Sequence, residues 1–402
     1  MTAEISATVN RPNVPESGGG ISCEVVVDPG ESDQPAERHI AICVDTSGSM
    51  DMRNKIDQVR DAANLVFGLL NEEDYLSIVS FDTDVDVILE ATRWGDIGRA
   101  EAERRVDRLE ARGGTDIYAG LEAAWGTLGE LGDGPDIAKR ILLLSDGRDT
   151  SFEANEFEPL AHSIAEDGIS IYSAGIGVDY DKNVIRTLGE QSQGRWVHVM
   201  NPADIRSFFG DVVQEASTVV ANNPRLVIEP VAPGTEIAEV YRRKPQVQRV
   251  DPEYEDGNVI IGLPDLQEEE KQQIVMKIDA PGGEVGKQRL IANVGLEAGS
   301  RSASTQLAVR YSDDEAELAE QNRDVFLAHR DTVIRSDLAR ADEEEDLEEV
   351  KSLIDETEII TGETQVVTEL RHDVTRIEEG DEEQTRRIQE QTTVVYEDER
   401  FE

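Results

Sequence analysis

The stretch Ile40-Ala-Ile-Cys-Val-Asp45-Thr-Ser47-Gly-Ser49-Met50 passes from apolar residues to oxygen-bearing residues within a few positions. Its apolar half, bounded by turn residues, is typical of a strand that is buried on both faces of a sheet. Asp45, Ser47 and Ser49 then follow where the strand leaves the sheet, which is where open α/β sheets bind ligands. Because hard divalent cations prefer oxygen ligands, the pattern indicates a metal site at this strand end.

Two later segments offer further oxygen ligands. Thr115 lies in the run Gly113-Gly-Thr-Asp116, directly before an amphipathic helical pattern. Asp146 ends a second buried-strand pattern, residues 141–145. Both segments therefore place an oxygen group at a position that the fold would bring to the same edge of the sheet.

Asp45-x-Ser47-x-Ser49, followed by Thr115 and Asp146 in this order, resembles the metal-ion-dependent adhesion site of von Willebrand factor A domains. The resemblance implies that the three hydroxyls bind the cation directly, while the two carboxylates act mostly through water or as hydrogen-bond acceptors. The alternative, that the two serines only cap the next helix, explains neither the threonine nor the second aspartate.

Ligand type favours Mg²⁺, with Mn²⁺ or Ca²⁺ as alternatives. Zinc is disfavoured because the set contains no cysteine or histidine. Mostly neutral direct ligands leave the cation electrophilic and one coordination position open. The resemblance implies that an Asp or Glu carboxylate of a partner protein fills that position, and that an AAA+ ATPase is a candidate member of the same assembly.

The order of elements predicts an α/β fold in several parts. Strand and helix patterns alternate from residue 39 to residue 220, which indicates a Rossmann-like von Willebrand factor A domain with a mostly parallel sheet and helices on both faces. Short strands without helices follow, which suggests a β-sandwich that the N-terminal strands join. We expect N-terminal strands, an inserted A domain, a sandwich and an acidic helical region, in the order 1–35, 36–221, 222–311 and 312–402. The layout resembles that of prokaryotic A-domain proteins.

Within the A domain, residues 97–109 read as one helix, and residues 85–89 should pair antiparallel with the strand before them, because the link is too short for a crossover. In the C-terminal region, Ser312 to Glu315 reads as a capping box that opens a helix reaching Leu338. Apolar stripes there favour packing within the region over a partner-binding surface. The polar stretch from Glu378 to Glu402 is expected to fray.

The chain is strongly acidic, with 86 Asp+Glu against 39 Lys+Arg and a formal net charge of −47 over 402 residues. Acid spread over every segment is typical of a protein from a high-salt cytoplasm, where salt screens self-repulsion. No basic stripe is available for nucleic acid. No segment has the length and hydropathy of a membrane span, and the first residues lack a signal-peptide pattern. We expect a soluble, cytoplasmic protein in which Cys23 and Cys43 are buried free thiols.

Three function classes remain open on sequence alone. A metal-dependent hydrolase would need a base beside the cation, and Asp82, Asp116 and Asp149 are the nearest acids in sequence. No phosphate-binding loop or nucleophile elbow is present. A scaffold in which the metal only stabilises loops is the second class. We favour the third, a non-enzymatic module that binds protein through its cation.

Overall fold

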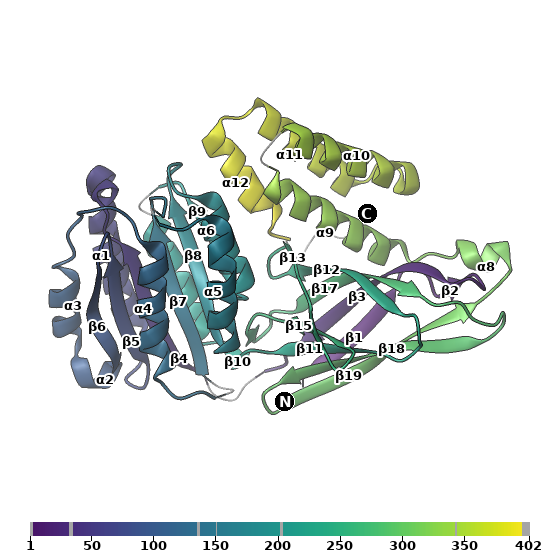
Figure 1. Ribbon diagram of the computed structural model, residues 1–402, viewed down its shortest axis with the longest axis horizontal. Helices are drawn as coiled ribbons and strands as arrows, with labels where there is room; N and C mark the ends of the chain where they lie inside the picture. The colour runs from purple at the N-terminus through teal and green to yellow at the C-terminus, as the bar shows by residue number, and fades with distance from the viewer. Residues whose placement is uncertain are drawn as a thin grey trace. The chain divides into compact units, whose positions relative to one another are not determined.

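The computed structural model describes residues 3–31, 35–134, 137–149, 151–201, 204–341 and 344–395. The chain forms two compact units. The first, here called the A unit, comprises residues 31–223 together with residues 264–268. The second, here called the sandwich unit, comprises residues 1–30, 224–263 and 269–402. The second unit therefore draws on sequence from both sides of the first (Figure 1).

The A unit is built on one sheet, whose described strands run in the order β6-β5-β4-β7-β8-β9. Neighbours pair in parallel except β5 and β6, whose antiparallel pairing the sequence predicts. Residues 40–44 of the central strand β4 are fully buried, as their apolar run indicates. The bounds are β4 (Glu37–Asp45), β5 (Tyr75–Phe81), β6 (Val85–Arg93), β7 (Ile137–Ser145), β8 (Ile169–Ile176) and β9 (Arg195–Val199).

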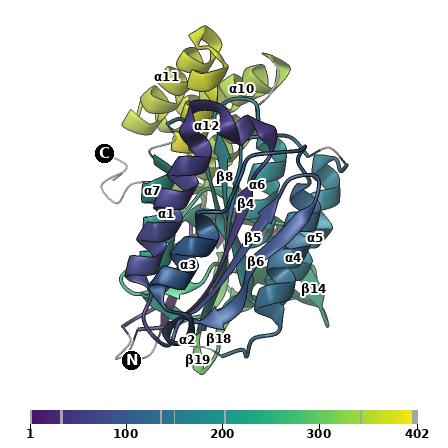
Figure 2. The same cartoon turned by 90° about the vertical axis from the view of Figure 1, so that its left-hand side faces the viewer.

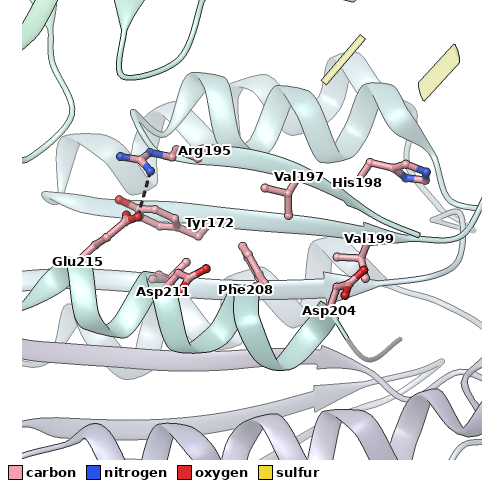
Figure 3. Close-up of a pocket in the computed structure, with 10 residues that line it drawn as sticks. Tyr172, Arg195, Val197, His198, Val199, Asp204, Phe208, Asp211 and Glu215 are labelled. Atoms are coloured by element: carbon pink, nitrogen blue, oxygen red, sulfur yellow. Dashed lines mark hydrogen bonds and ion pairs between the residues drawn. The ribbon is translucent and has the colours of Figure 1, made fainter. Parts of the chain in front are cut away.

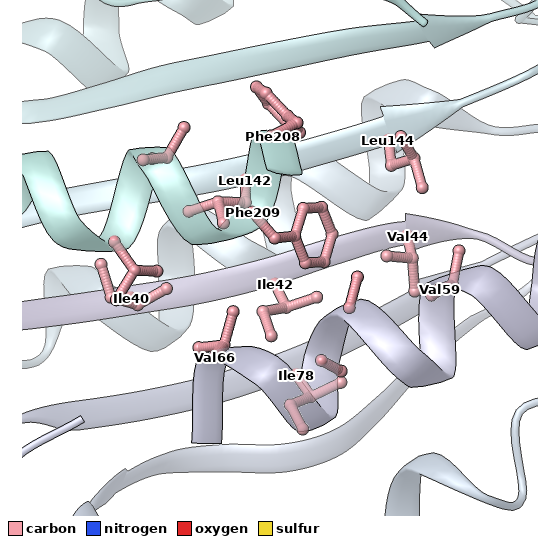
Figure 4. Packing of buried hydrophobic residues seen from close by; sticks show 14 of the residues in the cluster. Ile40, Ile42, Val44, Val59, Val66, Ile78, Leu142, Leu144, Phe208 and Phe209 are labelled. Atoms are coloured by element: carbon pink, nitrogen blue, oxygen red, sulfur yellow. The ribbon is translucent and has the colours of Figure 1, made fainter. Parts of the chain in front are cut away.

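Helices cover both faces of this sheet, because alternate residues of a strand point to opposite faces. Ile40, Ile42 and Val44 pack with α1, α3 and α7, whereas Ala41 and Cys43 pack with α4, α5 and α6. Figure 2 shows α1 and α4 on opposite sides of the sheet, and Figure 4 shows the core beneath α1 and α7. The helices are α1 (Lys55–Leu69), α3 (Arg99–Val106), α4 (Ile117–Gly129), α5 (Ala154–Glu166), α6 (Lys182–Gln191) and α7 (Ile205–Ala216).

The helix predicted over residues 97–109 is present but shorter, because α3 spans Arg99–Val106. The structure has a short helix α2 (Trp94–Ile97) and then α3, separated by Gly98. Gly98 has φ +75°, which is a left-handed conformation that ends a right-handed helix and that glycine adopts without strain.

The sandwich unit contains two sheets, and the strands before residue 30 belong to both. In one sheet, the order is β1-β3-β17-β12-β13, and in the other it is β14-β15-β11-β18-β19-β2. β3 pairs antiparallel with β17, and β2 pairs parallel with β19. The predicted architecture, an α/β unit inserted in a β-sandwich and followed by C-terminal helices, is confirmed. The bounds are β1 (Glu4–Val9), β2 (Asn13–Val14), β3 (Gly19–Asp28), β11 (Arg225–Pro230), β12 (Glu236–Lys244), β13 (Gln248–Arg249), β14 (Glu253–Glu255), β15 (Asn258–Gly262), β17 (Gln272–Ala280), β18 (Gln288–Ala298) and β19 (Arg301–Tyr311).

A two-stranded ladder completes the A unit. β10 (Val219–Ala221) pairs antiparallel with β16 (Leu266–Gln267), although the second strand lies within the sandwich part of the sequence. Beside it, Arg140 of β7 is fully buried and lies over the ring of Tyr172, with its guanidinium carbon 4.5 Å from the ring centroid. Burial raises the pKa of Asp265, in the same returning segment, to about 6, although Arg140 opposes the shift.

The C-terminal helices pack within the sandwich unit. Ala328 and Val333 of α9 contact Tyr241 and Val275 of the sheet, and α9 to α12 share a second apolar core. None of the helices in the described ranges combines the length and the hydropathy that crossing a bilayer requires. The helices are α8 (Glu315–Ala319), α9 (Arg323–Arg340), α10 (Glu344–Thr361), α11 (Gln365–Glu379) and α12 (Glu382–Thr392).

Two predictions for this region are corrected. The helix expected from Ser312 to Leu338 is interrupted, because Asn322 turns its side chain onto the backbone N–H groups of the next turn and starts a new helix. The cap of the first helix is Asp314. The tail expected to fray contains α12, in which Ile388 is buried. Residues 396–402 lie outside the described residues.

Candidate metal site

The two central strands end side by side, and this brings two predicted ligand segments together. β4 and β7 pair in parallel with Val44 opposite Leu144, so Asp45 and Ser145 leave the sheet at the same edge. The Ser145 hydroxyl donates a hydrogen bond to Asp45 Oδ2 at 2.6 Å, and the Ser47 N–H donates to Asp45 Oδ1 at 2.7 Å. Both oxygens of this carboxylate are therefore held by neighbours at the strand ends.

The serines of the loop after β4 continue this network. Ser47 Oγ and Ser49 Oγ lie 3.0 Å apart within hydrogen-bonding distance, and Ser49 Oγ donates to Asp146 Oδ1 at 2.6 Å. The side chain of Asp146 is fully buried. Four of the five predicted ligands, Asp45, Ser47, Ser49 and Asp146, thus form one cluster.

The fifth predicted ligand approaches from the loop before α4. The Gly48 N–H donates to the carbonyl oxygen of Gly113 at 3.3 Å, which ties this loop to the one after β4. Thr115 is buried, and a Cβ built on Gly147 would lie only 2.7 Å from Thr115 Oγ1. The threonine hydroxyl is therefore adjacent to the residue that follows Asp146, and three separate segments converge at one edge of the sheet.

Burial raises the pKa of Asp45 to about 6. Hydrogen bonds from Ser145 and Ser47 oppose the shift, and the nearby charge of Asp146 adds to it. Two carboxylates with little water around them favour a positive charge between or beside them.

The structure supplies one such charge that the sequence analysis did not single out. Lys55 Nζ donates to Asp146 Oδ2, and the two side chains are 10% and 0% exposed. Lys55 is the first residue of α1, and helical side chains lean toward the N-terminus of their helix, here toward the loop after β4. Its position at the start of the helix after the aspartate–serine motif is a signal that could have identified it.

The three acids considered as catalytic bases have backbone partners in the structure. Asp149 accepts hydrogen bonds from the N–H groups of Ile117 and Tyr118 at 2.7 and 3.2 Å, which holds its loop against the start of α4. Asp116 caps the same helix. Burial raises the pKa of Asp82, but hydrogen bonds from its own loop and from a neighbouring arginine outweigh this and lower it. Each acid therefore has a structural role in a loop around the site.

The residues present fit a small, hard cation. The converging groups are hydroxyl and carboxylate oxygens, and neighbouring oxygens around octahedral Mg²⁺ are about 3.0 Å apart, given Mg–O distances of about 2.1 Å. The two serine oxygens have this spacing. The missing Cβ of Gly147 leaves room beside the threonine hydroxyl. In the described ranges, this site included, no group of three or more His, Cys, Asp or Glu side chains is arranged to hold a metal, so the site depends on its hydroxyls together with two carboxylates.

A cavity of about 250 Å³ lies in another part of the A unit, between β8, β9 and α7 (Figure 3). Its lining includes Tyr172, His198 and Phe208, and an ion pair between Arg195 and Glu215 at 3.2 Å. None of the predicted metal ligands lines this cavity.

Comparison with known proteins identifies the family of the A unit. The von Willebrand factor type A domain family matches residues 39–213. An uncharacterized Synechocystis protein is 27% identical over 264 residues, which are 64% of this chain and 60% of that protein. Inter-alpha-trypsin inhibitor heavy chain H2 of Mus musculus is 27% identical over 203 residues, 48% of this chain but only 21% of the relative. The chain thus spans less than two thirds of the length of either relative.

Two solved structures share the fold across nearly the whole chain. A von Willebrand factor type A protein from Catenulispora acidiphila has a TM-score of 0.82 at 16% identity, with 98% of this chain and 97% of that chain covered. The ArnB paralog VWA2 from Sulfolobus acidocaldarius has a TM-score of 0.64 at 15% identity, with 98% of each chain covered. These identities establish likeness of fold alone. The family match, together with the strand order, shows that residues 39–213 of this chain are a von Willebrand factor type A domain.

Proposed function

We propose that the chain is a metal-dependent protein-binding module. A divalent cation, Mg²⁺ in preference to Mn²⁺ or Ca²⁺, is held by the hydroxyls of Ser47, Ser49 and Thr115, with Asp45 and Asp146 acting through water or hydrogen bonds. A carboxylate from a partner protein completes the coordination. The observation that carries this proposal is the convergence of three separate segments, which bring oxygen groups together at the carboxyl edge of the sheet, all of them buried except the half-buried Ser49.

The donor set supports binding more than catalysis. Neutral hydroxyl ligands leave most of the charge of a cation uncompensated, which favours capture of an anionic group. A hydrolase would also need a free base, whereas Asp149 and Asp116 hold the backbone at the start of α4. The H2 relative is by name one heavy chain of a larger inhibitor, which is consistent with a role in assembly.

The scaffold alternative gives the cation only the task of joining loops. Hydrogen bonds already connect the loop after β4 to Asp146 and to Gly113. Joining the loops therefore does not require a metal, and this favours the binding module.

The charge of the chain restricts the partner. A net charge of −47 repels a uniformly acidic protein. The partner is therefore expected to present a single Asp or Glu among neutral or basic residues. The proposal also includes a high-salt cytoplasm, which is inferred from the acidic composition. It further includes an AAA+ ATPase in the same assembly, which is inferred from the family resemblance.

The test is affinity capture with the full chain in molar KCl, with Mg²⁺ or with EDTA. The bait proteins are the wild type, Asp45→Asn and the control Glu122→Gln, which removes the same charge from an exposed position of α4. We expect a partner that is retained by wild type and Glu122→Gln in Mg²⁺ and is lost in EDTA or with Asp45→Asn. Equal retention under all conditions would contradict the metal-dependent module.

A further inference from the structure

Lys55 is placed to compete with the cation of the proposed site. Its ammonium group contacts Asp146 Oδ2, while the other oxygen of that carboxylate accepts from Ser49 at 2.6 Å. Asp146 is completely buried and only 10% of the Lys55 side chain is exposed. Both oxygens of this carboxylate are therefore already occupied by donors of the chain itself.

The backbone conformation of the two residues before Lys55 positions its side chain next to Asp146. Arg53 and Asn54 have φ values of +56° and +57°, a left-handed conformation that is uncommon for residues other than glycine. Two such residues in succession persist only where the surrounding structure holds them. They end the loop after β4 and start α1 at Lys55, whose side chain then leans back toward the loop.

The contact between Lys55 and Asp146 changes the net charge that a cation meets at the site. Asp45 and Asp146 together carry two negative charges when ionised, and Lys55 compensates one of them inside a buried cluster. A divalent cation that arrives at the serine hydroxyls meets this ammonium at close range, where little water screens the repulsion. The ammonium must then leave Asp146 or remain as an unfavourable neighbour.

We propose that Lys55 is a built-in counter-cation of the site, which holds Asp146 in the metal-free protein and lowers the affinity for free Mg²⁺. This inference rests on the proposed metal site and adds its regulation. With weak intrinsic loading, the cation is retained best when a partner carboxylate adds its own negative charge. Metal and partner therefore bind cooperatively, each raising the affinity of the other.

The test is a calorimetric titration of MgCl₂ into the full chain, at constant pH and KCl concentration. Lys55→Met removes the charge and keeps most of the side-chain volume. The control Lys287→Met makes the same change in net charge at an exposed turn of the sandwich unit. We expect Lys55→Met to bind Mg²⁺ at least about tenfold more tightly than wild type, and Lys287→Met to bind within about twofold of wild type.

A second readout is the melting temperature with EDTA and with Mg²⁺. In EDTA, Lys55→Met should melt below wild type, because a buried carboxylate loses its partner. Added Mg²⁺ should raise its melting temperature by more than it raises that of the wild type. If Lys55→Met does not fold, Lys55→Gln, which keeps an N–H donor without the charge, takes its place in both measurements.

Equal or weaker Mg²⁺ binding by the folded Lys55 variant would overturn the proposal, because Lys55 would then only position Asp146 or have no role. This outcome would leave the metal site itself intact. Absence of Mg²⁺ uptake by every protein, including wild type, would instead contradict the metal site together with this inference.

Discussion

A methyl group added at Gly147 should remove one metal ligand without changing any ligand residue. The Cβ of Gly147→Ala would lie 2.7 Å from Thr115 Oγ1, whereas ordinary contacts begin at 3.4 Å, so the hydroxyl must retreat by about 0.7 Å. Metal–ligand distances tolerate only about 0.2 Å. Rotation of the Thr115 side chain relieves the clash, so the fold survives at an overpacking cost of about 1–3 kcal/mol, but Oγ1 leaves its place.

We expect Gly147→Ala to weaken Mg²⁺ binding at least about tenfold, judged by the 10- to 100-fold losses that follow removal of even an outer-shell group. The matched control is Gly126→Ala, because a Cβ at Gly126, within α4, meets nothing within 4 Å. The control should keep its Mg²⁺ affinity and gain about 0.5–1 kcal/mol in free energy of unfolding. Calorimetry and urea unfolding measure both quantities. Unchanged Mg²⁺ affinity in Gly147→Ala would refute the placement of Thr115 as a ligand.

Three further predictions concern stability. Asp331 is fully buried and lies 2.5 Å from Arg243 and 2.6 Å from Arg335. Replacement of Asp331 by alanine should lower the free energy of unfolding by about 3–5 kcal/mol, because two buried cations lose their partner. A decrease below about 1 kcal/mol in urea unfolding would contradict this role of the ion-pair network. Burial lowers the pKa of His329 from 6.5 to about 4. Between these pH values the unfolded state therefore binds more protons than the folded state. About 3 kcal/mol in free energy of unfolding should be lost as the pH falls from 6.5 to 4. This loss should be smaller in His329→Gln than in wild type, and equal pH profiles would contradict it. The net charge of −47 should make the melting temperature rise from dilute buffer to molar KCl, and a flat profile would exclude the high-salt adaptation.

Much of the A unit could be predicted because its strands are buried on both faces. The run ending at Asp45 and the run ending at Asp146 have the continuous apolar pattern that such strands require, and the structure places them side by side. The clustering of Asp45, Ser47, Ser49 and Asp146 follows from this pairing, and the loop before α4 brings Thr115 next to Gly147. The sandwich could be predicted from evenly spaced short strands without helices, and the N-terminal strands are expected to join it because two strands alone cannot bury a face.

Other features depend on contacts that no local pattern reveals. The sequence shows Lys55 close after the aspartate–serine motif but does not reveal its partner, because only the parallel pairing of β4 and β7 brings Asp146 to it. The break before α9 depends on the side chain of Asn322 bonding to the backbone, in a region where apolar spacing suggests one helix. α12 is stabilised by Ile388, whose burial cannot be deduced from a segment that is otherwise polar.

The central claim is that one divalent cation binds among the hydroxyls of Ser47, Ser49 and Thr115. Anomalous diffraction from crystals of the full chain grown with Mn²⁺, which substitutes for Mg²⁺ in oxygen sites and scatters strongly, tests this directly. We expect one anomalous peak at the carboxyl edge of the A-unit sheet, about 2.2 Å from the serine oxygens. A well-ordered site without a peak at saturating Mn²⁺, or a peak only elsewhere on the chain, would contradict the claim.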